Sequence, residues 1–219
     1  MVKKKSVSLI INSKEIRAAE GEGLLWVALD NGIYIPNLCA IRERSEPFAS
    51  CRLCFVKIKG RAEPVTACTV PVKEGMVVDT TAPKALDLVR TTFELLLSSL
   101  PRDCARCPKS GRCEVQKIAR YLGVKLNTRR FKKIPRDLPV DSSSPEFIYD
   151  PNRCVLCGKC VWVCREKLGL GVIGFAYRGF RRMVTTFGDV PFAESACRNC
   201  GECVKICPVG ALVFKKKIV

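Results

Sequence analysis

The chain has 219 residues, 15 cysteines, no histidine and a formal net charge of +17. Its apolar runs are shorter than the roughly 18 residues of a membrane helix, so we expect no direct membrane insertion. An odd number of cysteines excludes complete pairing into disulfides within the chain, and residues 1–20 lack a signal-peptide pattern. Clustered cysteines in a protein that we expect to be cytoplasmic, a reducing compartment, indicate metal binding.

Residues 1–80 are predicted to form a small sheet packed on one helix. Strands are expected at 6–11, 15–18, 55–59, 65–68 and 76–79, with a short helix from Gly23 to Ala28. This order of elements is that of a β-grasp domain. Loops after the helix carry Cys39, Cys51 and Cys54, and Cys68 follows thirteen residues later, giving the spacing C-x11-C-x2-C-x13-C.

Residues 81–124 are predicted to form a small helical domain. Thr81 and Pro83 suit a helix start, and Pro101 suits its end. The apolar stripe expected to face the core is Leu86, Val89, Phe93, Leu96 and Leu100. Three cysteines, Cys104, Cys107 and Cys113, follow in a loop, and a second helix is expected over 114–122, stopped by Gly123.

Residues 125–146 are basic and then rich in serine and proline, which predicts an extended linker. Residues 147–219 hold two cysteine runs that form an internal pseudo-repeat, separated by an insert at 169–195 that we expect to form a hairpin over one metal site. The runs are Cys154-x2-Cys157-x2-Cys160-x3-Cys164 and Cys197-x2-Cys200-x2-Cys203-x3-Cys207-Pro208.

Both runs have the spacing with which bacterial ferredoxins hold [4Fe–4S] clusters, where the fourth cysteine of each run binds the other cluster. One predicted ligand set is therefore Cys154, Cys157, Cys160 and Cys207, and the other is Cys164, Cys197, Cys200 and Cys203. Zinc is the competing metal, because structural zinc sites also use C-x2-C pairs. Structural zinc, however, usually joins two such pairs across a spacer rather than using four cysteines within eleven residues.

The net positive charge of the chain has two possible interpretations. Thiolate ligands offset part of it, and the rest lies largely in Lys3–Lys5, Arg129–Lys133, Arg181–Arg182 and Lys215–Lys217. These runs are either solvated tails and loops or a basic surface that docks acidic partner subunits. Aromatic residues do not interleave with the basic ones as they do in single-strand binders, so we expect no nucleic acid as a partner.

Together these motifs, including the stretches "LPRDCARCPKSGRCEVQ" and "CRNCGECVKICPVGAL", resemble the N-terminal iron–sulfur region of the complex I G-type subunit and of [FeFe]-hydrogenases. The resemblance implies an α+β chain: a β-grasp [2Fe–2S] ferredoxin domain, a small helical three-cysteine cluster domain and a bacterial-type two-[4Fe–4S] ferredoxin domain. It assigns Cys39, Cys51, Cys54 and Cys68 to the [2Fe–2S] cluster. A free-standing chain of this length is similar to the small diaphorase subunit of NAD-reducing hydrogenases and to electron-transfer subunits of formate dehydrogenases.

One position departs from the family pattern. The family has a histidine four residues before the first cysteine of the middle group, as fourth ligand to a [4Fe–4S] cluster, whereas this chain has Leu100. Three outcomes stay open for Cys104, Cys107 and Cys113. They are a third [4Fe–4S] cluster with Asp103, solvent or a partner residue as its ligand; a [3Fe–4S] cluster; or no cluster.

The leading hypothesis is an electron-transfer subunit without catalytic residues, which is not an enzyme on its own. The resemblance implies a flavin- and NAD(P)-binding subunit and a catalytic hydrogenase or formate dehydrogenase subunit as partners, in a complex that in some relatives is electron-bifurcating. The first alternative is an enzyme acting at an open iron near Cys104–Cys113. Against it, no Gly-rich phosphate loop is evident and no histidine is present for acid–base chemistry. The second alternative is a zinc-binding basic scaffold or nucleic-acid-binding protein.

Overall fold

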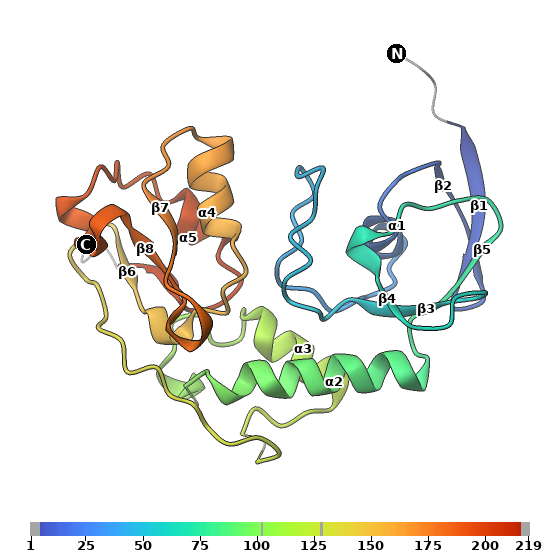
Figure 1. Ribbon diagram of the computed structural model, residues 1–219, viewed down its shortest axis with the longest axis horizontal. Coiled ribbons are helices and arrows are strands. Elements are labelled where there is room, and N and C mark those ends of the chain that lie inside the picture. Colours follow the sequence, from blue (N-terminus) through green and yellow to red (C-terminus); the bar gives the residue numbers. More distant parts are fainter. Residues whose placement is uncertain (1–4, 102, 128, 216–219) are drawn as a thin grey trace. The chain divides into compact units, whose positions relative to one another are not determined.

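The computed structural model describes residues 5–101, 103–127 and 129–215. The basic residues Lys3, Lys4, Lys216 and Lys217 lie outside them. The chain divides into two compact units, residues 1–93 and residues 94–219. Figure 1 shows the elements of each unit, and no helix in the described part of the chain is both long enough and apolar enough to cross a membrane.

The first unit contains a mixed five-stranded sheet with strand order β2-β1-β5-β3-β4. Its strands are β1 (Ser6–Ile11), β2 (Lys14–Ala19), β3 (Phe55–Ile58), β4 (Val65–Thr66) and β5 (Met76–Asp79). β1 and β5 run parallel, and the other pairs are antiparallel. Asn12 and Ser13 join β1 to β2 with φ values of 50° and 67°, and two positive φ angles give the turn the twist that a tight hairpin needs.

One apolar core holds this unit together. Alternate residues of β1, namely Val7, Leu9 and Ile11, are buried together with Leu24 and Leu25 of helix α1 (Leu24–Asp30). Burial of alternate strand residues and of one helix face is the packing that the sequence pattern predicts. The sheet and α1 therefore form a rigid support for the loops that carry the first four cysteines.

The predicted strand at 65–68 is shorter in the structure. β4 ends at Thr66, and Ala67–Thr69 forms a 3₁₀ turn in which the Thr69 hydroxyl donates to the Thr66 carbonyl over 2.9 Å. A hydroxyl that bonds to a nearby carbonyl offers the chain an alternative to the sheet ladder. Cys68 consequently lies in a turn rather than in the sheet.

Helix α2 (Pro83–Ser98) crosses the division between the two units. Its buried stripe is Ala85, Val89, Phe93 and Leu97, spaced by four residues. The apolar pattern of the sequence predicts Leu86, Leu96 and Leu100 on this stripe, but these three are only partly buried in the structure. The buried face begins at Ala85 rather than at Leu86, and residues four positions apart on a helix lie on the same face. Val89, Phe93 and Leu97 therefore continue the face that starts at Ala85.

The second unit contains the remaining helices, which are α3 (Glu114–Leu122), α4 (Lys159–Trp162) and α5 (Glu202–Ile206). Strand β6 (Phe147–Tyr149) pairs antiparallel with β9 (Leu212–Phe214). A second antiparallel pair, β7 (Ile173–Ala176) and β8 (Met183–Thr186), is the hairpin expected within the insert. The Tyr149 hydroxyl donates to the Val184 carbonyl over 2.7 Å, so the hairpin is tied to β6.

The segment predicted as a linker contains no helix or strand among its described residues, yet it is fastened along its length. The Lys133 ammonium donates to the carbonyls of Leu97 and Leu100 over 2.6 and 2.9 Å. Further along, the Asn152 side chain donates to the Leu138 carbonyl over 2.8 Å and accepts from the Leu138 N–H over 2.9 Å. These bonds hold the segment against the rest of the second unit.

Candidate metal centres

The loops of the first unit bring its four cysteines together. Cys39 and Cys54 are each 2% exposed, and the Cys51 N–H donates to the Cys39 sulfur over 3.5 Å. Hydrogen bonding with the Cys51 thiol lowers the pKa of Cys39 to about 5, and the pKa of Cys51 is raised by the same bond. A hydrogen bond between the thiols of Cys54 and Cys68 likewise raises the pKa of Cys54 and lowers that of Cys68. We call these four residues the sheet-domain set.

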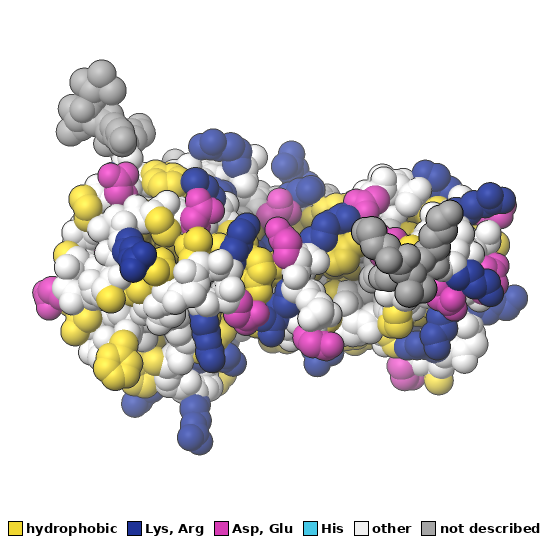
Figure 2. Space-filling view, turned by 90° about the horizontal axis from the view of Figure 1, so that it is seen from above, with side chains coloured by type: hydrophobic (Ala, Val, Ile, Leu, Met, Phe, Trp, Pro, Cys, Tyr) yellow, Lys and Arg dark blue, Asp and Glu magenta, His cyan; other side chains and the backbone are white. Residues whose placement is uncertain are grey.

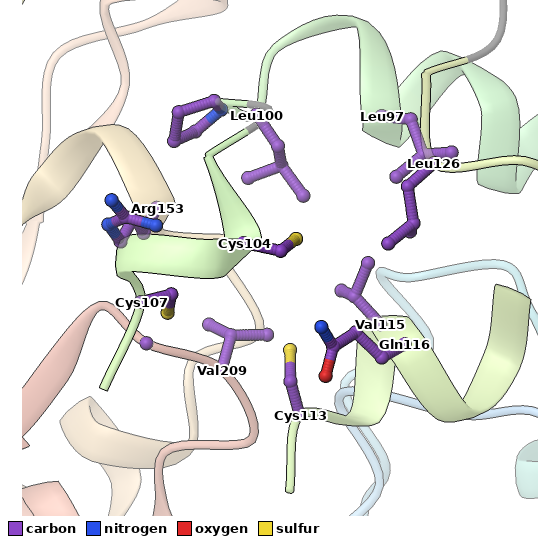
Figure 3. A pocket seen from close by; sticks show the side chains of 12 residues that line it. Leu97, Leu100, Cys104, Cys107, Cys113, Val115, Gln116, Leu126, Arg153 and Val209 are labelled. Atoms are coloured by element: carbon purple, nitrogen blue, oxygen red, sulfur yellow. The ribbon is translucent and has the colours of Figure 1, made fainter. Parts of the chain in front are cut away.

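The three middle cysteines line one small cavity of the second unit. Its other lining residues are Leu97, Leu100, Pro101, Val115, Gln116, Leu126, Arg153, Val209 and Gly210. Figure 3 shows the sulfurs of Cys104 and Cys113 pointing into the space that the side chains of Leu100 and Leu126 border. We call Cys104, Cys107 and Cys113 the three-cysteine site.

Cys113 lies at the N-terminus of α3. Burial raises the pKa of its thiol, the backbone N–H groups of Gln116 and Val115 lower it, and the charges of Cys107 and Cys104 raise it again. Because thiolate is the form that binds metal, N–H groups that stabilise it favour ligation. The start of a helix is the backbone feature that supplies such free donors.

The three-cysteine site is built against the end of the second ferredoxin run. The Glu114 N–H donates to the Pro208 carbonyl over 3.0 Å. At Gly210 a side chain would not fit, because a Cβ atom there would lie 2.5 Å from the Cys107 sulfur. Nothing in the local spacing of the middle cysteines indicates Gly210, so sequence reasoning missed it.

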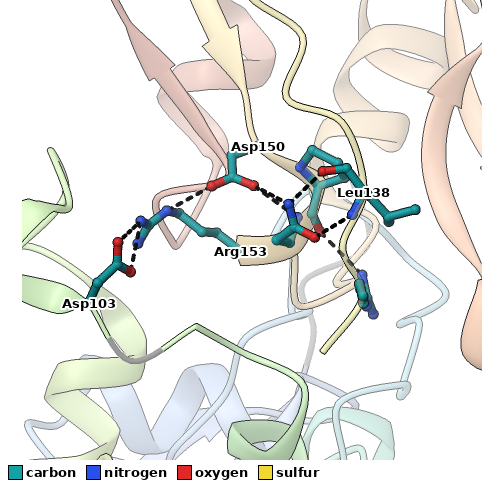
Figure 4. A network of polar contacts seen from close by, with 7 residues as sticks. Asp103, Leu138, Asp150 and Arg153 are labelled. Atoms are coloured by element: carbon teal, nitrogen blue, oxygen red, sulfur yellow. Dashed lines mark hydrogen bonds and ion pairs between the residues drawn. The ribbon is translucent and has the colours of Figure 1, made fainter. Parts of the chain in front are cut away.

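An ion-pair network flanks the same site. The Arg153 guanidinium donates to both carboxylate oxygens of Asp103 over 2.9 and 2.8 Å, and its Nε donates to Asp150 over 2.9 Å, as Figure 4 shows. Although burial lowers it, the pKa of Arg153 is raised by the bond to Asp103 and by the neighbouring charge of Cys107. Sequence reasoning also missed Arg153, which immediately precedes Cys154.

The structure brings the first predicted ferredoxin set together. Its four cysteines, Cys154, Cys157, Cys160 and Cys207, are 8, 7, 9 and 8% exposed. Burial raises the pKa of Cys154 to about 11 and that of Cys157 to about 12, and in both cases the charge of Cys207 raises it further. Cys207 is therefore a neighbour of the three cysteines of the first run. We call these four residues the first ferredoxin set.

The other predicted set is also brought together but is more open to solvent. Cys200 is exposed, and Cys164, Cys197 and Cys203 are partly buried. Burial raises the pKa of Cys203 to about 12, and the charges of Cys197, Cys200 and Cys164 raise it as well. Hairpin residue Ile173 lines the small cavity beside Cys164, Cys197, Cys200 and Cys203. We call these four residues the second ferredoxin set.

The two ferredoxin loops repeat one backbone conformation. Leu156 and Asn199 have φ values of 54° and 53°, and Gly158 and Gly201 have φ values of 79° and 72°. In the first loop the Leu156 N–H donates to the Cys154 sulfur over 3.4 Å, and in the second the Asn199 N–H donates to the Cys197 sulfur over the same distance. The loops thus point backbone donors at sulfur, which stabilises a thiolate.

The donor chemistry fits iron–sulfur ligation in three of the four places. Each of the two ferredoxin sets and the sheet-domain set offers four thiols, and Cys thiolates are the usual ligands of both [2Fe–2S] and [4Fe–4S] clusters. The three-cysteine site offers one thiol fewer. Among the described residues no three cysteine or acidic side chains are arranged to hold a single metal ion.

Comparison with family models divides the chain into three consecutive matches. Residues 4–83 match a 2Fe-2S iron-sulfur cluster binding domain. Residues 90–127 match the NADH-ubiquinone oxidoreductase-G iron-sulfur binding region, and residues 145–213 match the ferredoxin-like domain of NADH-quinone oxidoreductase subunit 3. These matches confirm the predicted [2Fe–2S] and [4Fe–4S] cofactors, and a zinc scaffold gains no support from them.

Similar proteins give the same result over the whole chain. NADP-reducing hydrogenase subunit HndD of Solidesulfovibrio fructosivorans is 34% identical over 94% of the chain, which spans 36% of HndD. The gamma subunit of NAD-reducing hydrogenase HoxS of Cupriavidus necator is 30% identical, with 96% of this chain and 88% of that protein covered. A crystal structure of NAD⁺-reducing [NiFe]-hydrogenase matches with a TM-score of 0.87 and 30% identity, covering 97% of this chain and 89% of the other. The chain therefore belongs to the iron–sulfur protein family that includes the gamma subunit of NAD-reducing hydrogenase HoxS.

Proposed function

We propose that the chain is an iron–sulfur electron-transfer subunit that connects a flavin- and NAD(P)-binding subunit with a catalytic subunit of hydrogenase type. The names of HndD and HoxS gamma, both subunits of NAD(P)-reducing hydrogenases, support this choice of complex. The strand order of the first unit supports a β-grasp [2Fe–2S] domain, and the repeated cysteine loops support a bacterial-type two-[4Fe–4S] domain. A formate dehydrogenase as the catalytic subunit and electron bifurcation by the complex stay predictions.

The observation that carries the proposal is the continuity of three cysteine sets within residues 94–219. Burial raises the pKa of the Cys160 thiol, and the neighbouring charges of Cys157, Cys154 and Cys207 of its own set and of Cys203 of the second ferredoxin set raise it further. On the other side, Cys107 contacts Gly210, three residues after Cys207. Single-electron transfer is the chemistry that such clusters supply when bound. Three neighbouring ligand sets would place three clusters in sequence, which suits the transfer of electrons from one cluster to the next.

The surrounding residues contribute burial and orientation. Burial of the first ferredoxin set excludes water from its thiols, and the backbone N–H of Leu156 donates to sulfur. Both factors adjust the potential of an iron–sulfur site. We assign catalysis to none of the residues, in keeping with a role in which substrates react on other subunits.

The surface charge on the face in Figure 2 fits docking to protein partners better than binding to nucleic acid. On the face in Figure 2, lysine and arginine side chains are interspersed with acidic ones rather than gathered into one stripe. A nucleic-acid footprint is a clustered basic face. We propose acidic subunit surfaces as partners of the basic residues, and the cytoplasm as the location.

Metal analysis and redox titration of the anaerobically purified full chain test the proposal. We expect abundant iron and negligible zinc, with EPR signals of a [2Fe–2S] centre and of interacting [4Fe–4S] centres on stepwise reduction with dithionite. NADH alone should leave the isolated chain oxidised, because electron entry requires the flavin subunit.

Two results would contradict the proposal. Zinc with negligible iron after cluster reconstitution would remove the electron-transfer role and restore the zinc scaffold. Turnover of NADH or hydrogen by the isolated chain would make it an enzyme in its own right, and the cavity beside Cys104 would then be the first place to examine.

A further inference from the structure

We propose that the three-cysteine site holds a three-iron [3Fe–4S] cluster in the oxidised protein, ligated by Cys104, Cys107 and Cys113 and closed on its fourth side by leucine. The inference rests on the proposed iron–sulfur function and adds the type of cluster at this one site. Three sulfur donors in place of four distinguish this site from the two ferredoxin sets.

The three donors are positioned for ligation. Cys104 lies in a 3₁₀ turn over Cys104–Arg106, and Cys113 lies at the start of α3, so two separate elements direct sulfur into one cavity. Gly210 leaves room for Cys107, since a Cβ atom there would lie 2.5 Å from its sulfur. The Cys107 sulfur therefore lies directly against the Gly210 backbone, beside the same cavity.

The fourth side of the cavity is apolar. Figure 3 shows the side chains of Leu100, Leu126 and Val115 directed toward the space between the sulfurs of Cys104 and Cys113. Iron needs a nitrogen, oxygen or sulfur donor, and hydrocarbon side chains supply none. An iron atom at this corner would be held by solvent alone.

The described polar residues of the cavity wall, apart from the cysteines, do not offer a ligand for iron. The Gln116 amide oxygen accepts from the Gly111 N–H over 2.7 Å, and its amide nitrogen donates to the Ser110 hydroxyl over 3.3 Å. The other described polar residue that lines the cavity, Arg153, is a cation and lacks a lone pair for iron.

Asp103, the acidic residue that the sequence suggested as fourth ligand, points elsewhere. Both of its carboxylate oxygens accept hydrogen bonds from Arg153, which Asp150 holds in turn, and Asp103 is not among the described residues that line the cavity. Figure 4 shows this carboxylate facing the guanidinium. Ligation by Asp103 would require the network to break, so three thiolates remain.

An iron held by solvent alone can be lost from a [4Fe–4S] cluster in two steps. Removing one electron from a [4Fe–4S]²⁺ core, with ferricyanide as the oxidant, gives a [4Fe–4S]³⁺ core. Loss of the solvent-held iron as Fe²⁺ then leaves [3Fe–4S]⁺, while the three thiolates stay bound. Each ferredoxin set offers four cysteines, one for each iron of a [4Fe–4S] cluster, so no iron there would be held by solvent alone.

Iron content and EPR of the full chain after ferricyanide oxidation and gel filtration test the inference. We expect about 13 irons per chain, with the near-isotropic signal of an oxidised three-iron cluster integrating to about one spin. Leu100→His supplies a nitrogen donor at the apolar corner, so iron should rise to about 14 per chain and the three-iron signal should disappear. Leu100→Ala, which removes the leucine without adding a donor, should keep the signal.

The wild-type chain alone can overturn the inference, whether or not Leu100→His folds. About 14 irons without the three-iron signal would mean that another group ligates the fourth iron. About 10 irons would mean that the site is empty. Both outcomes leave the signals of the other clusters in place, whereas absence of all iron would instead overturn the proposed function.

Discussion

The two ferredoxin sets share a sequence motif and a loop conformation but differ in their surroundings. Leu156 and Asn199 have matching positive φ angles, and an N–H to sulfur bond of 3.4 Å occurs in both loops. Yet the first set is buried throughout, whereas Cys200 of the second set is exposed. The motif therefore determines the loop, and the packing around the loop determines how much solvent reaches the site.

Removing one ligand from each set is expected to have the largest effect. Cys157→Ala and Cys200→Ala should each lose about four irons per chain, but Cys157→Ala leaves an unfilled space in the interior. Its thermal unfolding midpoint should fall below that of Cys200→Ala by roughly 4–8 °C, equivalent to about 2 kcal/mol, as followed by circular dichroism under argon. Equal midpoints would show that burial of the first set contributes no stability.

A side chain added at Gly210, between the first ferredoxin set and the three-cysteine site, should cause the next largest loss of iron. Gly210→Ala places a Cβ atom 2.5 Å from the Cys107 sulfur, so Cys107 must move away. We expect the loss of about three irons per chain, with the ferredoxin signals kept. Gly174→Ala is the control, because a Cβ atom there has no neighbour within 4 Å. Full iron content in Gly210→Ala would mean that Cys107 is not a ligand.

A smaller but measurable difference is expected between the two redox potentials. Reduction adds negative charge, which burial disfavours, so the second set should be reduced before the first during a potentiometric EPR titration. Cys200→Ala should remove the signal of higher potential. If Cys200→Ala removed the signal of lower potential instead, hydrogen bonds and nearby charges would outweigh solvent exposure.

The smallest predicted effect concerns the cation beside the three-cysteine site. Arg153→Gln removes a positive charge near Cys107, so the potential of this site should become more negative by tens of millivolts. Arg153→Lys keeps the charge but loses the two-pronged bond to Asp103, and its shift should be smaller. Equal shifts in the two variants would indicate that the orientation of Arg153, rather than its charge, matters.

Much of this fold follows from short-range sequence patterns. The alternation in β1, the Gly123 stop of α3 and the grouping of cysteines into runs each depend on residues close together in the chain. The buried face of α2 was predicted only in part, since Ala85 and Leu97 replace Leu86 and Leu96. Apolar periodicity alone does not decide between neighbouring residues when tertiary packing selects the face.

The parts of the site that sequence reasoning missed depend on contacts between distant residues. Arg153 reaches Asp103 across 50 positions of the chain, and Gly210 meets Cys107 from still further away. The segment predicted as an extended linker is held by Asn152, which bonds to Leu138 across 14 positions. No local pattern encodes such pairings.

The contact between Gly210 and Cys107 also has a consequence for biosynthesis. Ribosomes add about 5–20 residues per second, so roughly 5–20 s separate the synthesis of Cys113 from that of Gly210. During this interval the three thiols of the site exist without the Pro208–Gly210 segment that completes their cavity. We therefore expect metal loading at this site to follow translation of the last cysteine run, because the cavity is complete only when residues 208–210 are present.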